Sequence, residues 1–418
     1  MLTYLLEYNR YAHVIGIVVV LMLAWLLSYD RKKINYGLVL KALGMQVIFG
    51  ILLIKVPVIE EYLFMPLAAG FTALCGFARE GAHFVFGNLS TVCIESWGCV
   101  FAFNVLPLII YFAALASILS HYGIIQAIVS GLNRVIRPLL GTSGAETLSA
   151  TSNLILGQTE APLLIKNYLA TMSESQLFVV MVSGMAHMSA GLLAVYYAMG
   201  IPMKHMIIAA AMGIPGAILI AKIIVPEQGS VDTSATTRQE RKGNIFDAIF
   251  QGTSTGTSLA IIVGAMILVF LGLLPLLDAI IGGFGCLINW CLAFVDVQIP
   301  ALSLGYLFSW VFAPIAWLLG FTGTDFTQAA QLLGTKISIN EFVAFTKMTS
   351  MHFSERATIL LTYAIGNFAN LASIGMQVGG ISALAPSCQS TLAKLGFRAL
   401  LGASLVGLLS AFIIGLLI

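Results

Sequence analysis

The sequence GQTEAP at residues 157–162 places an amide, a hydroxyl and a carboxylate between glycine and proline in an otherwise apolar chain. It lies within a longer polar run, GAETLSATSNLILGQTEAPLLIKNY, at residues 144–168. A second polar run, NEFVAF, occupies residues 340–345. Both runs are polar stretches in an apolar chain, and the predicted fold must bury them away from lipid.

The composition is that of a polytopic membrane protein. The 418 residues are 59% hydrophobic and only 9% charged, and the mean hydropathy is +0.98. Soluble domains are about one quarter charged. Apolar runs that approach or exceed the roughly 20 residues of a membrane-crossing helix recur along the chain, and we predict about eight transmembrane helices.

The sequence lacks the motifs of ATP-driven pumps and of the common intramembrane enzymes. It contains no GxxxxGK[ST] loop, no CxxC and no HExxH. Ser189 lies two positions from His187, and on a helix this spacing directs the two side chains apart. The basic residues are spread along the chain, so no nucleic-acid-binding face is indicated. We expect neither an enzyme nor a resident cofactor.

Two copies of one pattern are 181 residues apart. Glu160 and Ser173 in the first half recur as Glu341 and Ser354 in the second. Each copy continues into an apolar helix that is interrupted by Gly, Asn, Ser or His. An odd number of predicted crossings separates the copies, so the second is expected to be inverted. Inverted repeats with interrupted helices are typical of secondary transporters.

The repeat defines the organisation that we predict. Non-helical backbone at membrane depth must be buried in protein or line a cavity, so the two polar runs are interpreted as re-entrant hairpins. The predicted segments are N-terminal transmembrane helices with an interfacial helix (1–100), a first repeat (101–225) with a hairpin (144–170) and a broken helix (174–199), a cytoplasmic linker (226–245), and a second repeat (246–418) with a hairpin (326–350) and a broken helix (356–378).

Glu160 and Glu341 are carboxylates that these hairpins place inside the membrane. An acid there costs at least about 2.5 kcal/mol on insertion scales and is a functional candidate by default. NEFVAF supplies an amide and an acid that suit vicinal hydroxyls, and GQTEAP suits the edge of a heterocycle. Asn370 and Ser373 are three residues apart, on one face of an intact helix, and would complete the site. Phe368 could stack on a planar ligand.

The two acids have other possible roles. In a purely structural role they would pair with Lys166 and Lys347, each six residues further along the chain. A hairpin transporter for amino acids or dicarboxylates would need cationic groups at the site, and this site is acidic and rich in amides. A channel would not need two matched acids on two hairpins.

The segments GAETLSATSNLILGQTEAPL, GTKISINEFVAF and GNFANLASIG resemble the signature segments of the concentrative nucleoside transporter family. The likeness extends from DRKK at 30–33, through WVFAPIAWLLG at 310–320, to ISALAP at 381–386. It implies an all-α subunit of eight transmembrane helices and two re-entrant hairpins, arranged as a homotrimer. It also implies cation-coupled symport of a uridine-like nucleoside by an elevator mechanism, in a bacterial inner membrane.

The resemblance also implies the roles of individual residues. The nucleobase would contact Gln158, Thr159, Glu160 and Leu192. The ribose would contact Glu341, Asn370 and Ser373, with Phe368 at the border of the pocket. The coupling cation would lie at Asn153, Leu156, His187 and Met188.

His187 departs from the family pattern, because sodium-coupled relatives have a small hydroxyl residue at this position. Imidazole is a poor sodium ligand but a good proton carrier near neutral pH. We favour sodium because Asn153 and the rest of the hairpin are retained. The alternatives are a proton-coupled nucleoside symporter that uses His187, and a hairpin-type symporter for another small polar solute. The choice between pyrimidine and purine nucleosides is left open.

Overall fold

Every regular element is a helix in the residues that the computed structural model describes, which are 9–90, 100–228, 244–292 and 302–418. A helix satisfies its own backbone hydrogen bonds, as a chain in contact with lipid requires. The prediction of an all-α membrane protein is confirmed.

Five helical segments of this described part are long and apolar enough to cross a membrane by themselves. They are Tyr36–Lys55, Pro57–Ser90, Ala102–His121, Met203–Ile224 and Pro386–Leu417. The broken helices divide into pieces that are too short to cross a membrane by themselves, such as Glu174–Ala186 and Leu371–Leu384. The estimate of about eight crossings counted each broken helix as one span.

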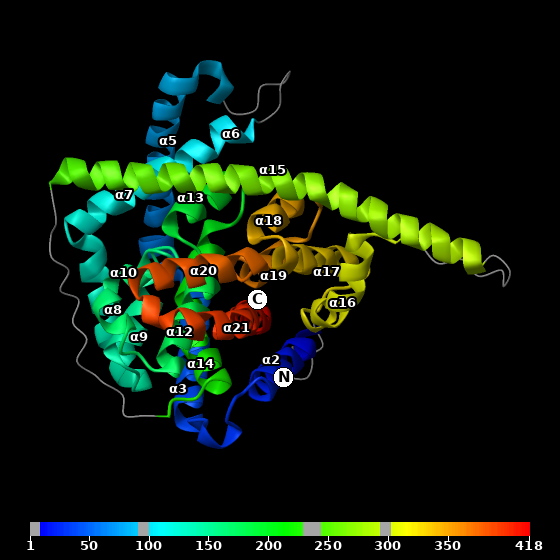
Figure 1. Ribbon diagram of the computed structural model, residues 1–418, viewed down its shortest axis with the longest axis horizontal. Helices are drawn as coiled ribbons and strands as arrows, with labels where there is room; N and C mark the ends of the chain where they lie inside the picture. The colour runs from blue at the N-terminus through cyan, green and yellow to red at the C-terminus, as the bar shows by residue number, and fades with distance from the viewer. Residues whose placement is uncertain (1–8, 91–99, 229–243, 293–301) are drawn as a thin grey trace.

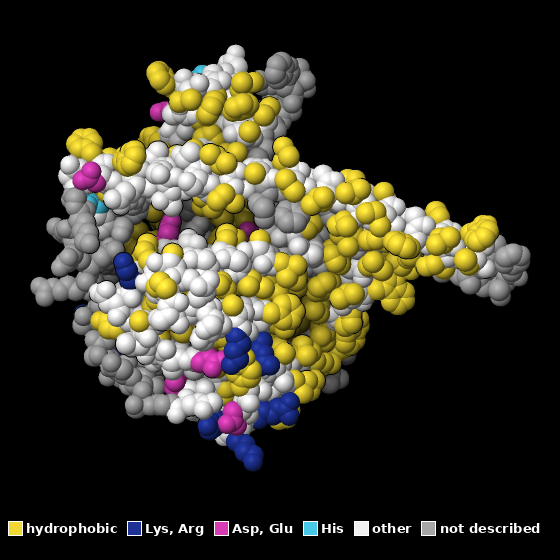
Figure 2. All heavy atoms as spheres, viewed as in Figure 1, with side chains coloured by type: hydrophobic (Ala, Val, Ile, Leu, Met, Phe, Trp, Pro, Cys, Tyr) yellow, Lys and Arg dark blue, Asp and Glu magenta, His cyan; other side chains and the backbone are white. Residues whose placement is uncertain are grey.

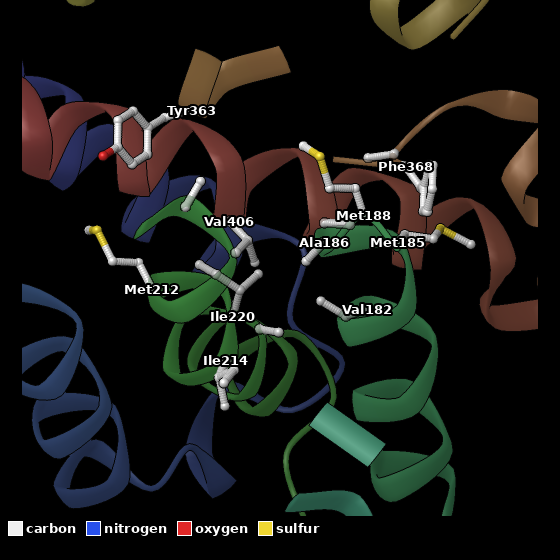
Figure 3. Close-up of a cluster of buried hydrophobic side chains, with 14 of the residues drawn as sticks. Val182, Met185, Ala186, Met188, Met212, Ile214, Ile220, Tyr363, Phe368 and Val406 are labelled. Atoms are coloured by element: carbon white, nitrogen blue, oxygen red, sulfur yellow. The ribbon is translucent and has the colours of Figure 1, made fainter. Parts of the chain in front are cut away.

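Two helices form the centre of the bundle, α14 (Met203–Ile224) and α21 (Gln389–Leu417). In their most apolar stretches 89% and 83% of the residues are buried, against 33% for α3 (Tyr36–Lys55). The helices α2 (Arg10–Leu26), α3 and α12 (Glu174–Ala186) pack against them (Figure 1). Figure 3 shows Val182 of α12, Ile220 of α14 and Val406 of α21 in one apolar cluster.

The helix α15 (Ile245–Leu292) has 48 residues and runs across the outside of this bundle (Figure 1). It packs against α7 (Leu106–His121). A Cβ on Gly252 would lie 2.8 Å from the Cα of Ala114, and a Cβ on Gly256 would lie 2.8 Å from the Cα of Ile110. Small residues four apart allow such close approach of membrane helices, so these glycines permit the pairing of α7 with α15.

A helical arm reaches beyond α15 at the top of Figure 1. Its elements are α5 (Met65–Phe86), η4 (Gly87–Ser90) and α6 (Phe101–Asn104). Before it, α4 (Pro57–Ile59) and the π-helical turn η3 (Glu60–Phe64) lie against the bundle, where Glu60 pairs with Lys204 of α14 at 2.7 Å. Only 11% of the most apolar stretch of Pro57–Ser90 is buried, and Phe84 is 92% exposed. An exposed apolar surface of this kind is suited to contact with lipid or with another subunit.

Each half of the chain contains a helix, a hairpin and a broken helix, in that order. The first half has α8 (Ile124–Leu140), hairpin 1 with α9 (Gly144–Ser152), α10 (Ala161–Leu164) and α11 (Lys166–Leu169), and the broken helix of α12 and α13 (Ala190–Ala198). The second has α16 (Leu304–Leu318), hairpin 2 with α17 (Gly323–Ser338) and α18 (Glu341–Ser350), and the broken helix of α19 (Glu355–Ile365) and α20 (Leu371–Leu384).

Short elements and breaks complete the chain. The helices α16 and α17 meet at an angle of 116°, so the apolar run there does not form one straight crossing. Two short 3-10 helices, η2 (Arg31–Lys33) and η6 (Pro386–Cys388), precede α3 and α21. Most of the expected linker, 229–243, lies outside the described residues.

Equivalent residues of the two halves begin equivalent helices. Ser173 caps α12, and Ser354, which is 181 residues later in the sequence, caps α19; each serine side chain accepts a backbone N–H three residues on. Ser189 and Asn370 have the same separation and are the N-cap residues of α13 and α20. Serine and asparagine are favoured at this position because they can accept the free N–H groups of a first turn; Asn370 does so, whereas the Ser189 side chain makes no cap hydrogen bond. The second part of each broken helix therefore starts at the same position of the repeat.

A buried charge cluster ties hairpin 1 to the bundle beside the linker. Lys222 Nζ on α14 lies 2.7 Å from Glu146 Oε2 on α9 and 2.9 Å from Glu227 Oε2, and it donates to Ser175 Oγ on α12 at 3.1 Å. Ser173 Oγ donates to Glu227 Oε1 at 2.8 Å. Burial of the Glu227 carboxyl acts to raise its pKa, but Lys222 and the hydrogen bonds outweigh burial and hold the pKa below its usual value.

Replacement of Lys222 with methionine is expected to destabilise the protein, because removing one partner of a buried ion pair typically costs about 3–5 kcal/mol. The measurement is the temperature at which detergent-purified protein loses its monodisperse gel-filtration peak. Lys394→Met is the matched control, since Lys394 pairs with Glu174 where the side chains are 61% and 40% exposed, and such surface pairs contribute little. Equal losses in both variants would contradict a special role for the buried cluster.

The contribution of Glu227 to stability is expected to depend on pH. Its pKa is lower in the folded protein than in the unfolded chain, so its stabilising effect is present at neutral pH and is lost as the pH falls through the folded-state pKa. Glu227→Gln should therefore lower the thermal stability at pH 7, and the difference from wild type should shrink below about pH 4. A difference that stays constant across this range would show that the carboxylate charge is not responsible.

Candidate functional site

A cavity of about 370 Å³ lies beneath α15, where the tips of both hairpins meet the broken helices. Figure 2 shows the hollow below α15, with acidic side chains visible inside it. The lining includes Gln158, Thr159, Glu160, Leu192, Tyr196, Leu259, Ile262, Val263, Asn340, Glu341, Phe368, Asn370 and Met376. An apolar cavity of this size with a few converging polar groups is suited to a small polar ligand.

Glu341 begins α18 at the tip of hairpin 2, and its carboxylate is bound from two directions. Tyr196 Oη donates to Glu341 Oε1 at 3.1 Å, and Asn370 Nδ2 donates to Oε2 at 2.9 Å. Asn340 caps α18 by accepting the N–H of Val343 at 2.8 Å, which fixes the tip. Glu341 is only 4% exposed, and its oxygens retain lone pairs that can accept ligand hydroxyls.

Gln158, Thr159 and Glu160 form the turn between α9 and α10 at the tip of hairpin 1. Glu160 Oε2 accepts the backbone N–H of Gly157 at 3.4 Å, so this carboxylate folds back over its own turn. Gln158 Nε2 donates to Ser373 Oγ on α20 at 3.5 Å. The tips of the two hairpins therefore face one cavity, and α20 contacts both.

The sequence predicted Asn370 and Ser373 on one face of an intact helix, but the helix is broken before Asn370. Asn370 is instead the N-cap residue of the next helix and binds Ser373 in its first turn. The helix α19 ends at Ile365 and α20 begins at Leu371. Asn370 Oδ1 accepts the backbone N–H of Ser373 at 3.0 Å and its hydroxyl at 3.1 Å. Asn370 thus binds Glu341 through its nitrogen and Ser373 through its oxygen. Ser373 itself is fully buried behind the wall of the cavity.

Phe368 and Leu192 supply apolar surface to the cavity. Phe368 lies in the break between α19 and α20, close to Met185 and Met188 at the end of α12 (Figure 3). The exposed fractions of Phe368 and Leu192 are 8% and 4%. Packing against the core on one side holds the Phe368 ring while its other side borders the cavity.

Neither acid is paired with the lysine that follows it by six residues. Among the described residues no ion pair joins Glu160 to Lys166 or Glu341 to Lys347. Lys347 instead lines a separate cavity. The cation that acts electrostatically on Glu341 is Lys336 of α17, which is 2% exposed. The structural interpretation of the two acids is therefore not supported.

The residues expected to hold the coupling cation lie where α9 ends and α12 breaks. Asn153 Nδ2 donates to the carbonyl of Ser149 at 2.9 Å and to Ser183 Oγ at 3.3 Å. Asn153 Oδ1 is buried and has no hydrogen-bond partner in the described part of the chain. Leu156 and Met188 are 8% and 2% exposed. Asn153 therefore offers one unused oxygen in a buried polar region.

His187 is the C-cap residue of α12, and its ring packs between α12 and α14. Its Nδ1–H donates to the carbonyl of Ser183 at 2.7 Å. Its Nε2 faces α14 at Gly213, where a Cβ would lie only 2.8 Å away. The hydrogen bond through Nδ1 and the packing against α14 together fix the orientation of the His187 ring.

Several residues of the cavity were not identified from the sequence. Tyr196 follows Leu192 by four positions, so the two share one face of α13, and this spacing was a usable signal. Leu259, Ile262 and Val263 of α15 also line the cavity. They are ordinary apolar residues, and only the path of α15 across the hairpin tips brings them there.

The chain matches known sequences over nearly its whole length. The family profile described as Na+ dependent nucleoside transporter C-terminus matches residues 205–415, the corresponding N-terminus profile matches 15–89, and a profile described as nucleoside recognition matches 102–203. The nucleoside permease NupC of Helicobacter pylori is 36% identical, over 97% of each chain. The chain belongs to the Na+-dependent, or concentrative, nucleoside transporter family.

More distant relatives and solved structures agree with this assignment. The sodium/nucleoside cotransporter 1 of Mus musculus is 31% identical, over 96% of this chain and 63% of that protein. The structure of CNTnw in an inward-facing substrate-bound state is similar with a TM-score of 0.89 at 35% identity, over 97% of this chain and 98% of that chain. A CNTnw variant in an outward-facing state gives a TM-score of 0.90.

As a member of this family, the protein is a cation-coupled nucleoside symporter that works by alternating access. It is a multi-pass protein of the bacterial inner membrane and not an enzyme. The cavity beneath α15 is the candidate substrate site of this transporter.

The variant Glu341→Gln is expected to lower uridine uptake by at least about tenfold, because it weakens charge-assisted hydrogen bonds to the ligand. Uptake of radiolabelled uridine into proteoliposomes provides the measurement, with gel filtration as a check of folding. Glu355→Gln is the matched control, since Glu355 is exposed at the start of α19. Wild-type uptake by Glu341→Gln would remove Glu341 from the site.

Proposed function

We propose that the protein imports nucleosides into the cell by sodium symport, with the nucleoside bound in the cavity between the two hairpin tips. The observation that carries this proposal is the convergence of Gln158 from hairpin 1 and Glu341 from hairpin 2 on one largely apolar cavity. A nucleoside has a hydroxyl-rich sugar at one end and a planar heterocycle at the other. A cavity that binds it therefore needs different polar groups at its two ends.

The ribose is assigned to the hairpin 2 side of the cavity. Glu341 is ready to accept hydroxyl protons, and Asn370, which binds it at 2.9 Å, supplies an amide beside it. Ser373 supports Asn370 from behind at 3.1 Å. Phe368 borders the sugar and shields these hydrogen bonds from water. Hydrogen bonds to a carboxylate in such a site are stronger than neutral ones.

The nucleobase is assigned to the hairpin 1 side. Gln158, Thr159 and Glu160 offer an amide, a hydroxyl and a carboxylate along one turn, which can match the alternating donors and acceptors at the edge of a base. Leu192 faces the same cavity and supplies an apolar surface for the flat face of the ring. A uridine-like nucleoside fits this pattern.

Sodium is proposed as the coupling ion, held by Asn153 Oδ1 and by the backbone carbonyls of Leu156 and Met188. Sodium prefers oxygen ligands, and the Asn153 oxygen is buried without another partner among the described residues. His187 uses its Nδ1–H on the Ser183 carbonyl at 2.7 Å, which is a role for a neutral ring that needs no proton exchange. Proton coupling through His187 is the second candidate, because the ring is buried next to Ser183, a neighbour of Asn153.

The transport step is proposed to be an elevator movement in a homotrimer. Hairpin 1 and the broken helices pack on the central helices α14 and α21, and hairpin 2 packs on α16 and α19, whereas α7 and α15 form a close pair of which α15 lines one side of the cavity. Movement of the first group past this pair would carry the cavity across the membrane. The exposed apolar arm of α5 provides a surface for contact between subunits.

The coupling ion is tested with uridine uptake into proteoliposomes under an imposed sodium gradient or an imposed pH gradient. We expect accumulation with the sodium gradient alone, and His187→Ser should leave this sodium dependence in place. Accumulation driven by the pH gradient, and lost in His187→Ser, would instead make the histidine the coupling residue. No accumulation of uridine under either gradient would contradict the proposed substrate.

A further inference from the structure

Gln377 on α20 is a fully buried glutamine directly behind the tip of hairpin 1. Its Nε2 donates to Gln158 Oε1 at 3.4 Å, and this is the one side-chain hydrogen bond that it makes within the described part of the chain. Its own Oε1 is buried without a partner there. A buried amide oxygen without a partner is unfavourable, so the presence of Gln377 calls for an explanation beyond packing.

A glycine in α12 makes room for this contact. A Cβ on Gly184 would lie 1.9 Å from Gln377 Nε2 and 3.3 Å from the Cβ of Gln158. Real Cβ atoms do not approach other atoms as closely as the first distance. The backbone of α12 therefore confines the Gln377 amide against Gln158, and any side chain at position 184 would push the two glutamines apart.

Hydrogen bonds at both ends of the Gln158 amide set which way it faces, because Gln377 donates to its oxygen and Ser373 Oγ, whose own proton goes to Asn370, accepts from its nitrogen. One end of an amide only accepts hydrogen bonds and the other only donates them. The Gln158 oxygen is turned to Gln377, and its nitrogen is turned to Ser373 Oγ at 3.5 Å and Met376 Sδ at 3.8 Å. Met376 lines the cavity, whereas Ser373 and Gln377 do not. The NH2 group lies toward Met376 and is thus the end of Gln158 nearer the cavity.

We propose that Gln377 is a positioning residue that orients the Gln158 amide and thereby sets the selectivity of the transporter among nucleobases. With the NH2 group on the cavity side, Gln158 favours a base that presents a carbonyl oxygen, such as uracil, over one that presents an amino group at the same place, such as cytosine. The proposal rests on the proposed function, in which Gln158 contacts the nucleobase.

The test compares uridine and cytidine uptake in proteoliposomes for wild type and Gln377→Met, which has a similar volume but no donor. The expected result is a fall of about fivefold in the ratio of kcat/KM for uridine to that for cytidine, because the Gln158 oxygen loses the donor that holds it away from the cavity and can turn to the base. The ratio for uridine to 3′-deoxyuridine should not change, because the ribose side is untouched.

A matched control is available in Gln46 of α3. It is also fully buried, and its Nε2 donates to Ser410 Oγ on α21 at 3.0 Å, away from the cavity. Gln46→Met removes the same type of group and should change uptake of uridine and cytidine by the same factor. Gly184→Ala is a second test variant, which retains both glutamines but displaces them, and it should lower the uridine-to-cytidine ratio as Gln377→Met does.

The outcomes separate this proposal from the function on which it rests. Equal effects on uridine and cytidine in Gln377→Met, with the ratio at its wild-type value, would show a purely structural role and overturn the proposal. If Gln377→Met is not monodisperse in gel filtration, an unchanged ratio in Gly184→Ala would overturn it equally. Failure of the wild-type protein to take up either nucleoside would instead contradict the proposed function.

Discussion

The hydrogen-bonded carboxylate of Glu341 is the interaction on which the rest of the site depends. A charge buried at membrane depth is tolerated only when its oxygens are bound. Tyr196 from α13 and Asn370 from the break before α20 bind them at 3.1 and 2.9 Å. Three elements that are far apart in the sequence must therefore meet at one point, and the cavity lies where they meet.

The bases of the two hairpins are held by different polar contacts. At its base, hairpin 1 is fastened to α12 and α14 by the buried cluster around Lys222, with ion pairs of 2.7 and 2.9 Å. At the base of hairpin 2, Ser354 Oγ donates to Asp325 Oδ2 at 3.3 Å in an exposed position. The two hairpins share a sequence pattern, but the polar contact at the base is a buried ion-pair cluster in hairpin 1 and an exposed hydrogen bond in hairpin 2.

Much of the candidate site could be found from the sequence because polar residues stand out in an apolar chain. Gln158, Thr159, Glu160, Glu341 and Asn370 were all marked in this way, and they line one cavity. Lys336 carried the same signal, as a cation in the segment GTKISINEFVAF, but its electrostatic interaction with Glu341 was not identified. The apolar residues of α15 carried no signal, since nothing distinguishes them from lipid-facing residues of the same helix.

The fold class, the two polar runs and the spacing that relates them can be predicted from the amino-acid order, since they follow from hydropathy and from the requirement to bury unpaired backbone groups. How the pieces meet cannot be predicted in this way. The break at Asn370, the partners of Glu341, the orientation of the Gln158 amide and the direction of the His187 ring were decided by tertiary structure. Each depends on an atom within about 3 Å that comes from another helix, or on a local backbone path that neighbouring helices select.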